Sequence, residues 1–422
     1  LPAEVIIATV ETNQRYFTVF NVRDELLPAF ITVSNIDSKQ PQEVITGNER
    51  VVRPRLADGL FFWHQDLRCK LEEYGPKLEA ITFQKKLGSL ASKVARNAAL
   101  ARQLADAMGA DAAAAERAAS LSKNDLVTQM VGEFPELQGL MGGYYATRSG
   151  EPQAVADAIR DHYLPIHHGG ELPATPEGRA VALADKLDTL AGYFAVGQKP
   201  TASKDPFGLR RAALGIIRIL VEAELNLDLR SWLQTALAAQ PAGEQGEDVL
   251  GELLAFLHER QRAWSIGREV DGQIITAEAF EAVAALALTQ PLDTERRLRA
   301  VVGFLHSSAA ASLAAADKRA RNILRQAGET PPTDIAPSGN PAEAALLAAV
   351  KDAEARLTPL REHSDYRAML EQLAMLKAPV DRFFEDVRVM DDDPVVRAAR
   401  LGLLARLDGL CREVADLSRL PG

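Results

Sequence analysis

The spacing of apolar and polar residues separates a short strand-forming start of the chain from a long helical remainder. Three runs rich in β-branched residues are separated by polar turns: Glu4–Val10, Tyr16–Phe20 and Phe30–Val33. Their alternation predicts a few strands. Residues 47–66 have helical spacing and an apolar Leu-Phe-Phe-Trp stretch near their end, so we expect a helix there that packs on the strands.

Long helical periodicities fill residues 77–147 and are joined by a short break at Met108-Gly109, which predicts antiparallel helices. Two loops are expected, one at residues 162–176, which contain HHGG and three prolines, and one at 197–207. Asp205-Pro206 predicts an N-cap and a first-turn proline for the helix that follows.

The helical pattern continues through residues 226–290, with weak breaks at 240–246 and 271–273. The final unit begins near Thr294 and contains an insertion at 328–341, which is too rich in Pro, Gly and Ser to form a core element. Four or five helices are expected around that insertion. The pattern predicts a mainly α protein, and we find no fixed-period repeat of the solenoid kind.

Length and composition predict how many structural units the chain forms and in which cellular compartment it functions. A chain of 422 residues exceeds the roughly 250–300 residues that one core supports, so we expect two to four structural units. Cys69 and Cys411 lie far apart without a CxxC partner, which excludes a disulfide framework or a thiolate metal cluster and favours the cytoplasm. The chain contains no run of about 18 consecutive apolar residues, so we predict no membrane span. Because the chain opens with Leu1-Pro2 and strand-like sequence, we expect the C-terminal piece of a longer polypeptide.

Charge limits how the chain can meet nucleic acid. The formal net charge of −10 argues against a protein that coats nucleic acid through an overall positive field. A local basic stripe can still hold phosphates, so any RNA contact is expected in patches.

One helix, residues 312–326, has two chemically distinct faces. Small and apolar residues recur on one face, and basic and amide residues lie on another. Arg and Asn can hydrogen-bond base edges and Lys can neutralise phosphate, yet spacing alone favours a solvated basic face. The packing face comprises Leu313, Ala316, Ala320 and Ile323, and the polar face comprises Lys318, Arg321, Asn322 and Arg325.

Two strings of this C-terminal part carry a resemblance. AAADKRARNIL (314–324) and APVDRFFEDVRVMDDDPVVRAARLGLLARL (378–407) resemble the anticodon-binding fold shared by arginyl-tRNA synthetases and the β subunit of the bacterial two-subunit glycyl-tRNA synthetase. GNERVVRPRLADGLFFW (47–63), LSKNDLVTQMVGEFPELQGLMGGYYA (121–146) and KDPFGLRRAALGIIRIL (204–220) are similar to that β subunit. An arginyl enzyme would need a Rossmann catalytic domain, and neither GxGxxG nor GxxxxGK[ST] follows a strand here.

The resemblance implies the tRNA-binding, C-terminal part of a glycine–tRNA ligase subunit. It implies that a separate α subunit, in an α2β2 complex, activates glycine with ATP and Mg²⁺, so we expect no catalytic residue, metal or cofactor on this chain. tRNA(Gly) and the α subunit are the implied partners, with no DNA and no membrane. The implied anticodon contacts are Lys318, Arg319, Arg321, Asn322 and Arg325, with Arg319 off the basic stripe.

The resemblance also implies a domain organisation. Residues 1–70 would be the end of an upstream domain with a few strands and a helix, and 71–225 an HD-like helical domain. Residues 226–290 would be a helical linker or body region, and 291–422 the anticodon-binding, DALR-like domain.

The HD-like part departs from its hydrolase relatives at the metal site. HD hydrolases use histidines and aspartates to hold a metal that activates water, but the pair position here reads Lys123-Asn124-Asp125. Asp185 and Asp188 are candidates for the late acid. We therefore expect a hydrolase fold reused for packing or RNA contact. His162, His167 and His168 are interpreted as exposed loop residues rather than ligands.

Two further basic clusters have open interpretations. Lys199, Lys204, Arg210 and Arg211 surround a helix N-terminus and are candidate tRNA phosphate contacts, although Asp205 at the cap opposes phosphate there and a salt-bridge surface fits equally. The arginines within 47–66 are interpreted as internal ion-pair partners rather than RNA contacts.

Two other functions stay open for the whole chain: a metal-dependent HD phosphohydrolase, which would need histidine ligands, and a protein-binding helical scaffold.

Overall fold

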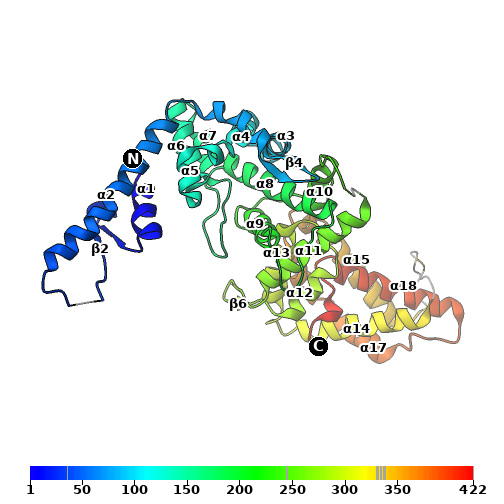
Figure 1. The fold of residues 1–422 in the computed structure, drawn as a ribbon. Coiled ribbons are helices and arrows are strands. Elements are labelled where there is room, and N and C mark those ends of the chain that lie inside the picture. Colours follow the sequence, from blue (N-terminus) through cyan, green and yellow to red (C-terminus); the bar gives the residue numbers. More distant parts are fainter. Residues whose placement is uncertain (36, 244–245, 329–331, 333–334, 336–338, 422) are drawn as a thin grey trace. The chain divides into compact units, whose positions relative to one another are not determined.

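The computed structural model describes the chain apart from residues 36, 244–245, 329–331, 333–334, 336–338 and 422. The described residues form 18 α-helices and three two-stranded antiparallel sheets, which confirms the mainly α fold class (Figure 1). They pack as two compact units, the first comprising Leu1–Ile219 with Ser231–Leu253 and the second Leu220–Arg230 with Leu254–Gly422. This division does not test the predicted four-part organisation, which stays a prediction.

The chain begins with a helix, not with the strand predicted at Glu4–Val10. Helix α1 spans Ala3–Ile7 and continues as a π-helical turn at Ala8–Asn13. Val5 is buried, and its Cγ1 would lie 3.4 Å from a Cβ at Gly59. A helix here buries the apolar residues in one contact with the next helix, and this packing overrides their β propensity.

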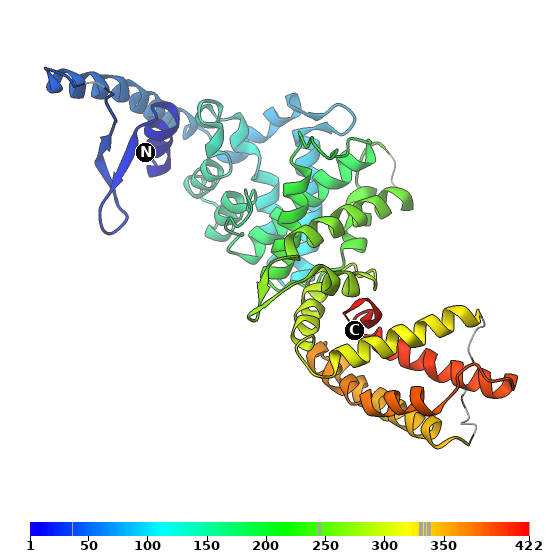
Figure 2. The same cartoon turned by 90° about the horizontal axis from the view of Figure 1, so that it is seen from below.

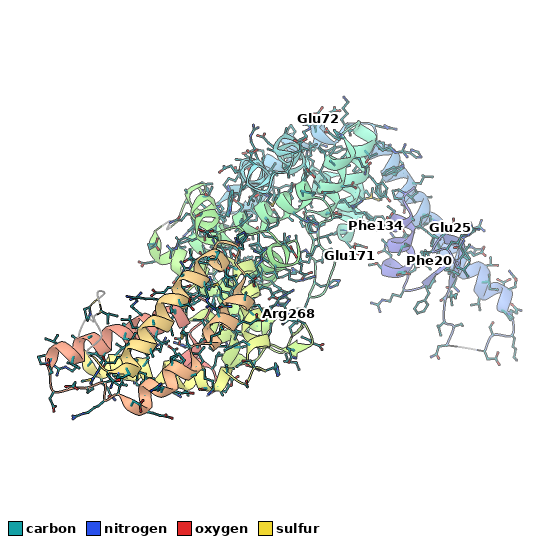
Figure 3. The ribbon with its side chains drawn as sticks, turned by 180° about the vertical axis from the view of Figure 1, so that it is seen from behind. Phe20, Glu25, Glu72, Phe134, Glu171 and Arg268 are labelled. Carbon is teal, nitrogen blue, oxygen red and sulfur yellow. The ribbon has the colours of Figure 1, made fainter. Side chains whose placement is uncertain are left out.

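The strand predicted at Tyr16–Phe20 is confirmed, whereas the one predicted at Phe30–Val33 lies earlier in the chain and overlaps the prediction only at its end. Strands β1 (Phe17–Phe20) and β2 (Leu26–Ile31) pair antiparallel, and Figure 3 labels Phe20 and Glu25 at the turn end of the resulting ribbon. Helix α2 (Pro41–Asp66) follows as predicted, and the Tyr16 hydroxyl donates to Asn48 on it at 2.6 Å.

Two arginines of α2, Arg53 and Arg55, make ion pairs inside the first unit. Arg53 pairs with Glu49 at 3.0 Å, as predicted. Arg55 pairs with Glu133, 3.5 Å away in a later helix.

The rest of the first unit is a layered helical body. The break at Gly109, which has a positive φ of 70°, separates α3 from α4, and these two helices pack side by side. The loop predicted after residue 162 is present, and Figure 3 labels Glu171 in it. The bounds are α3 Leu90–Met108, α4 Ala112–Leu121, α5 Gln129–Glu133, α6 Leu140–Ser149, α7 Gln153–Asp161 and α8 Pro176–Ala195, with short 3-10 turns at Leu71–Ala80, Asn124–Val127 and Pro135–Leu137 and the strands β3 Thr82–Gln84 and β4 Gly88–Ser89.

Helix α9 (Leu209–Glu222) starts later than Asp205-Pro206 predicts. The Asp205 carboxylate nevertheless accepts hydrogen bonds from the amides of Leu209 and Arg210, both at 2.9 Å, so it caps the helix across a short turn. Helices α10 (Leu229–Ala238), α11 (Glu247–Ser265) and α12 (Ala277–Ala284) continue the predicted helical stretch. The hairpin of β5 (Glu269–Val270) and β6 (Gln273–Ile274) occupies the predicted break at 271–273.

The second unit ends in a helical bundle. The described residues from Pro291 onward form six helices rather than four or five. Figure 2 shows α14 in yellow beside α18 in red, with the orange helices completing the bundle. The bounds are α13 Pro291–Phe304, α14 Ala310–Ala327, α15 Pro341–Glu362, α16 Tyr366–Ala374, α17 Lys377–Asp386 and α18 Pro394–Cys411, followed by a 3-10 turn, η5, at Leu417–Arg419. Much of the predicted insertion 328–341 lies outside the described residues.

No helix among the described residues is long and apolar enough to cross a membrane.

A buried carboxylate ties α2 to the helical body. Asp66 is 2% exposed, and its carboxylate accepts hydrogen bonds from the amides of Gln129 and Met130 and from the Tyr145 hydroxyl, each at 2.9 Å. The two amides begin α5, so the negative charge also meets the positive end of that helix. One side chain therefore satisfies three donors that would otherwise be buried without partners.

Replacing Asp66 with Ala should destabilise the first unit. Because it orphans buried donors, Asp66→Ala should lower the free energy of unfolding by about 2–4 kcal/mol. Asp58→Ala, at an exposed position of the same helix, is the matched control and should stay within about 0.5 kcal/mol. Urea unfolding of both variants checks this, and equal effects would contradict it.

Candidate nucleic-acid interface

Helix α14 presents the predicted basic face to solvent. Lys318 and Arg325 are exposed and Asn322 is half-buried between them, one and two helical turns along the same side. The predicted packing face is confirmed, since Leu313, Ala316 and Ala320 are buried and Ile323 packs partly against the core. We call the exposed line of Lys318, Asn322 and Arg325 the α14 ridge.

Arg321 lies on one flank of the ridge and is held by carboxylates. Its guanidinium contacts the Asp408 carboxylate of α18 at 2.6 and 2.9 Å, and it also pairs with Asp416 just before η5. The Ser418 hydroxyl accepts a further hydrogen bond from it at 2.8 Å. This predicted anticodon contact therefore joins α14 to α18 and η5 inside the unit.

Asp317 sits behind this flank without a hydrogen-bond donor. Its side chain is fully buried, neither carboxylate oxygen has a hydrogen-bond partner, and its nearest cation is Arg321 at 3.7 Å. Burial, together with the nearby negative charge of Asp408, raises the pKa of Asp317 to about 7. Three carboxylates therefore share one guanidinium, and one of them keeps its proton in moderately acidic solution.

The other flank of the ridge carries Arg319. Its guanidinium carbon lies over the ring of Phe384 on α17, 4.4 Å from the ring centroid. Within the ridge, the Arg325 guanidinium donates to the Asn322 side-chain oxygen at 2.9 Å. The Lys318 ammonium and the Arg325 guanidinium are exposed, and the hydrogen bond from Arg325 leaves the Asn322 amide nitrogen free to act as a donor.

The second basic cluster, around the start of α9, is split by the structure. Lys199 pairs with Glu252, and the Arg210 guanidinium donates to the Thr201 carbonyl. Lys204 and Arg211 are exposed. The capping carboxylate of Asp205 occupies the helix N-terminus, so only these side chains, and not the helix end, can attract phosphate.

The helical body of the first unit contains a buried ionic cluster. The Lys123 ammonium lies 2.8 Å from Nε2 of His162 and 3.2 Å from the Asp185 carboxylate, and 3.8 Å above the centroid of the Tyr163 ring. Nδ1 of His162 donates to the Ile159 carbonyl at 2.6 Å, so Nε2 carries the lone pair that accepts from Lys123. Burial and the charge of Lys123 hold the pKa of His162 well below its usual value, which keeps the imidazole neutral.

A second lysine completes the charge balance of this cluster. Lys93 pairs with Asp188 at 2.9 Å and with Asp185 at 3.2 Å, and Arg96 pairs with Asp188 at 2.6 Å. Burial alone would raise the pKa of Asp185, but the ammonium groups of Lys123 and Lys93 together hold it well below its usual value. The Asp125 carboxylate accepts hydrogen bonds from backbone amides, at 2.6 Å from Gly139 and 3.0 Å from Gly142.

The prediction that His162 is exposed is wrong. Its side chain is fully buried, whereas His167 and His168 are exposed as predicted. His162 continues the apolar spacing of Val155 and Ile159 on α7, a signal that sequence reasoning could have used. The Lys123 ammonium lies between the imidazole and Asp185, and the Lys93 ammonium contacts both aspartates, so the two positive charges would repel a divalent cation. Within the described ranges, no group of three His, Cys, Asp or Glu side chains is placed to hold a metal ion.

The raised pKa of Asp317 predicts that the free energy of unfolding depends on pH. The pKa of Asp317 in the folded protein lies above its unfolded value of 3.8. Ionisation of Asp317 therefore lowers the stability of the folded protein as pH rises from about 4 to 7, and above pH 7 the loss of stability is complete and stays constant. At about 1.4 kcal/mol per pKa unit, the penalty is on the order of 4 kcal/mol. Asp317→Asn should therefore gain stability relative to the parent chain as pH increases, measured by urea unfolding at pH 5 and pH 8. A stability difference that is the same at both pH values would contradict this assignment.

The buried ionic cluster predicts a large effect of one lysine. Lys123→Met leaves the Asp185 carboxylate with less compensation and should cost about 3–5 kcal/mol of unfolding free energy. Lys86→Met, at an exposed position of the same unit, should be nearly neutral. In a double-mutant cycle, adding Asp185→Asn to Lys123→Met should recover part of the loss, and strict additivity of the two changes would refute the coupling.

Comparison with known proteins covers the whole chain. A sequence model of the family described as "Glycyl-tRNA synthetase beta subunit" matches residues 1–279, and one described as "DALR anticodon binding domain" matches residues 313–414. The second match includes α14, α17 and α18 and therefore the α14 ridge with both of its flanks.

Named relatives agree with the first match. The chain is similar to the glycine–tRNA ligase beta subunits of Chromohalobacter salexigens and Ectopseudomonas mendocina, each 46% identical, and of Pseudomonas aeruginosa, 44% identical. Each comparison covers 100% of this chain and 61% of the relative's length. The chain therefore belongs to the glycyl-tRNA synthetase beta subunit family.

Proposed function

We propose that this chain is the tRNA-binding part of a glycine–tRNA ligase beta subunit and that the α14 ridge contacts the anticodon of tRNA(Gly). The observation that carries the proposal is the position of the ridge. It is exposed on a helix whose opposite face is buried and whose Arg321 flank is ion-paired, and it lies within the match to an anticodon-binding domain. The name of the relatives, glycine–tRNA ligase beta subunit, supports glycine as the amino acid that is attached to the tRNA.

The side chains of the ridge suit different parts of an RNA loop. Lys318 offers a flexible ammonium for a phosphate, whereas the Asn322 amide can hydrogen-bond a base edge. The clamp of Arg321 to Asp408 and Asp416 favours a role in fixing α14, so we place this arginine behind the RNA contact and not in it. Lys204 and Arg211 are the better candidates for phosphate contacts elsewhere, because Lys199 and Arg210 already have partners within the chain.

The proposal includes a division of labour between subunits. Glycine activation with ATP and Mg²⁺ and transfer to the tRNA would take place on an α subunit in a cytoplasmic α2β2 complex, with no catalytic residue on this chain. The beta-subunit relatives are longer than the span matched here. Activity of the assembled ligase is therefore a property of the complete subunits.

A metal-dependent phosphohydrolase is the weaker alternative. Its water-activating metal would have to bind among Lys93, Lys123 and His162, where two ammonium groups already compensate the aspartates. A protein-binding scaffold would leave the exposed basic side chains of the ridge without a role.

Binding of tRNA(Gly) and of an anticodon-swapped tRNA tests the proposal. Asn322→Ala should reduce discrimination between the two tRNAs by about 1–3 kcal/mol if its amide reads a base. Lys318→Ala should weaken both tRNAs alike and make the slope of log affinity against log salt shallower by about one charge. Fluorescence anisotropy at several salt concentrations measures both quantities.

Arg367→Ala is a matched control, because Arg367 is 85% exposed on α16 and pairs with Glu371 within its own helix. It should leave affinity and discrimination unchanged. Wild-type affinity and discrimination in both ridge variants would refute the proposed anticodon contact.

A further inference from the structure

The pair formed by Arg319 and Phe384 lies beside the α14 ridge and plays no part in the helix clamp on the opposite flank. Arg319 is exposed, and its guanidinium carbon lies over the Phe384 ring, 4.4 Å from the centroid. Phe384 is half-buried and meets the fully buried Phe383 edge to face, with centroids 5.6 Å apart. The aromatic ring is thus anchored in the core while the cation covers its outer side.

This geometry suits a flat ligand better than a phosphate. A guanidinium is planar and, when it covers an aromatic face, leaves its other face available for stacking. Unstacked RNA bases are bound in this way by aromatic rings and arginine planes.

The charged residues around the pair also favour a base over a phosphate as the ligand. Phe384 is followed directly by Glu385 and Asp386, both exposed, and α17 also carries Asp381 one turn earlier. Lys377 pairs with Asp381 and Arg382 pairs with Asp386, so among the described residues Glu385 is the carboxylate here that makes no ion pair. Its charge disfavours a phosphate at this flank, whereas a neutral base does not meet that repulsion. The ridge itself, one side chain away, carries the cations that a neighbouring phosphate requires.

We propose that Arg319 and Phe384 form a platform on which one unstacked base of the tRNA anticodon loop stacks, next to the phosphate- and base-edge contacts of the α14 ridge. The inference rests on the proposed function and adds the pair's role within it. Arg319, which lies off the basic stripe, would then bind RNA through the flat face of its guanidinium and not by attracting a phosphate. Phe384 would support that stacking surface.

The test separates planarity from charge. Arg319→Lys keeps the positive charge but loses the stacking plane, and Phe384→Leu keeps an apolar side chain but loses the ring. Arg382→Lys, an exposed arginine on α17 that pairs with Asp386, is the matched control. Each protein is titrated with tRNA(Gly) carrying pyrrolocytosine, a cytosine analogue whose fluorescence falls on stacking, at one anticodon cytosine at a time.

The expected result has two parts. Arg319→Lys and Phe384→Leu should each weaken binding about 10-fold, within the range for loss of one base stack, and should abolish the fluorescence decrease at one position. The salt slope should stay that of the parent chain, because no phosphate contact is lost. The control should bind and quench like the parent, and thermal melting should show all three variants folded.

Two results would overturn the inference. One is quenching and affinity of Arg319→Lys equal to the parent. The other is a salt slope that falls by about one charge in Arg319→Gln while quenching persists, which would identify a phosphate contact. If Lys318→Ala and Asn322→Ala are silent too, the proposed function fails together with the platform; if those two matter and Arg319→Lys does not, only the platform fails.

Discussion

The clamp of Arg321 onto Asp408 and Asp416 sets the orientation of α14, and the candidate interface depends on that orientation. The guanidinium joins α14 to the last turn of α18 and to the turn that follows α18. An arginine can do this because its planar fork serves several acceptors at once. With one flank of α14 fixed in this way and its small residues buried, the line of Lys318, Asn322 and Arg325 has only solvent to face.

The clamp also carries a cost that is visible in its surroundings. Asp317 is buried next to the same arginine with neither oxygen hydrogen-bonded, and the charges of Asp408 and Arg321 oppose each other in setting its ionisation. The first unit solves a similar problem differently, since Lys93 and Lys123 supply an ammonium group for each of its buried aspartates. In that unit compensated charges hold α3, α7 and α8 together. Both arrangements use buried charge to hold helices together.

Sequence reasoning succeeded where one periodicity dominated. The two faces of residues 312–326, the break at Gly109 and the helix at 47–66 all follow from helical spacing, and the structure confirms them. It failed where a partner distant in sequence decides the outcome. The run Glu4–Val10 has strand propensity but packs as a helix on α2, and the buried imidazole of His162 accepts a hydrogen bond from Lys123, which lies 39 residues earlier. The stripe of 312–326 likewise could not show that Arg321 points to acids of α18, or that Arg319 lies over Phe384, since those acids and that ring lie 65 or more residues away.

The central claim is that RNA lies along the α14 ridge. Ultraviolet cross-linking of tRNA(Gly) to this chain, followed by mass spectrometry of the protein–nucleotide adducts, locates the contact without any substitution. The account predicts adducts in residues 318–325 and at Phe384, and their loss when an excess of unmodified tRNA(Gly) competes. Specific adducts confined to the first unit, with none on α14 or α17, would contradict it.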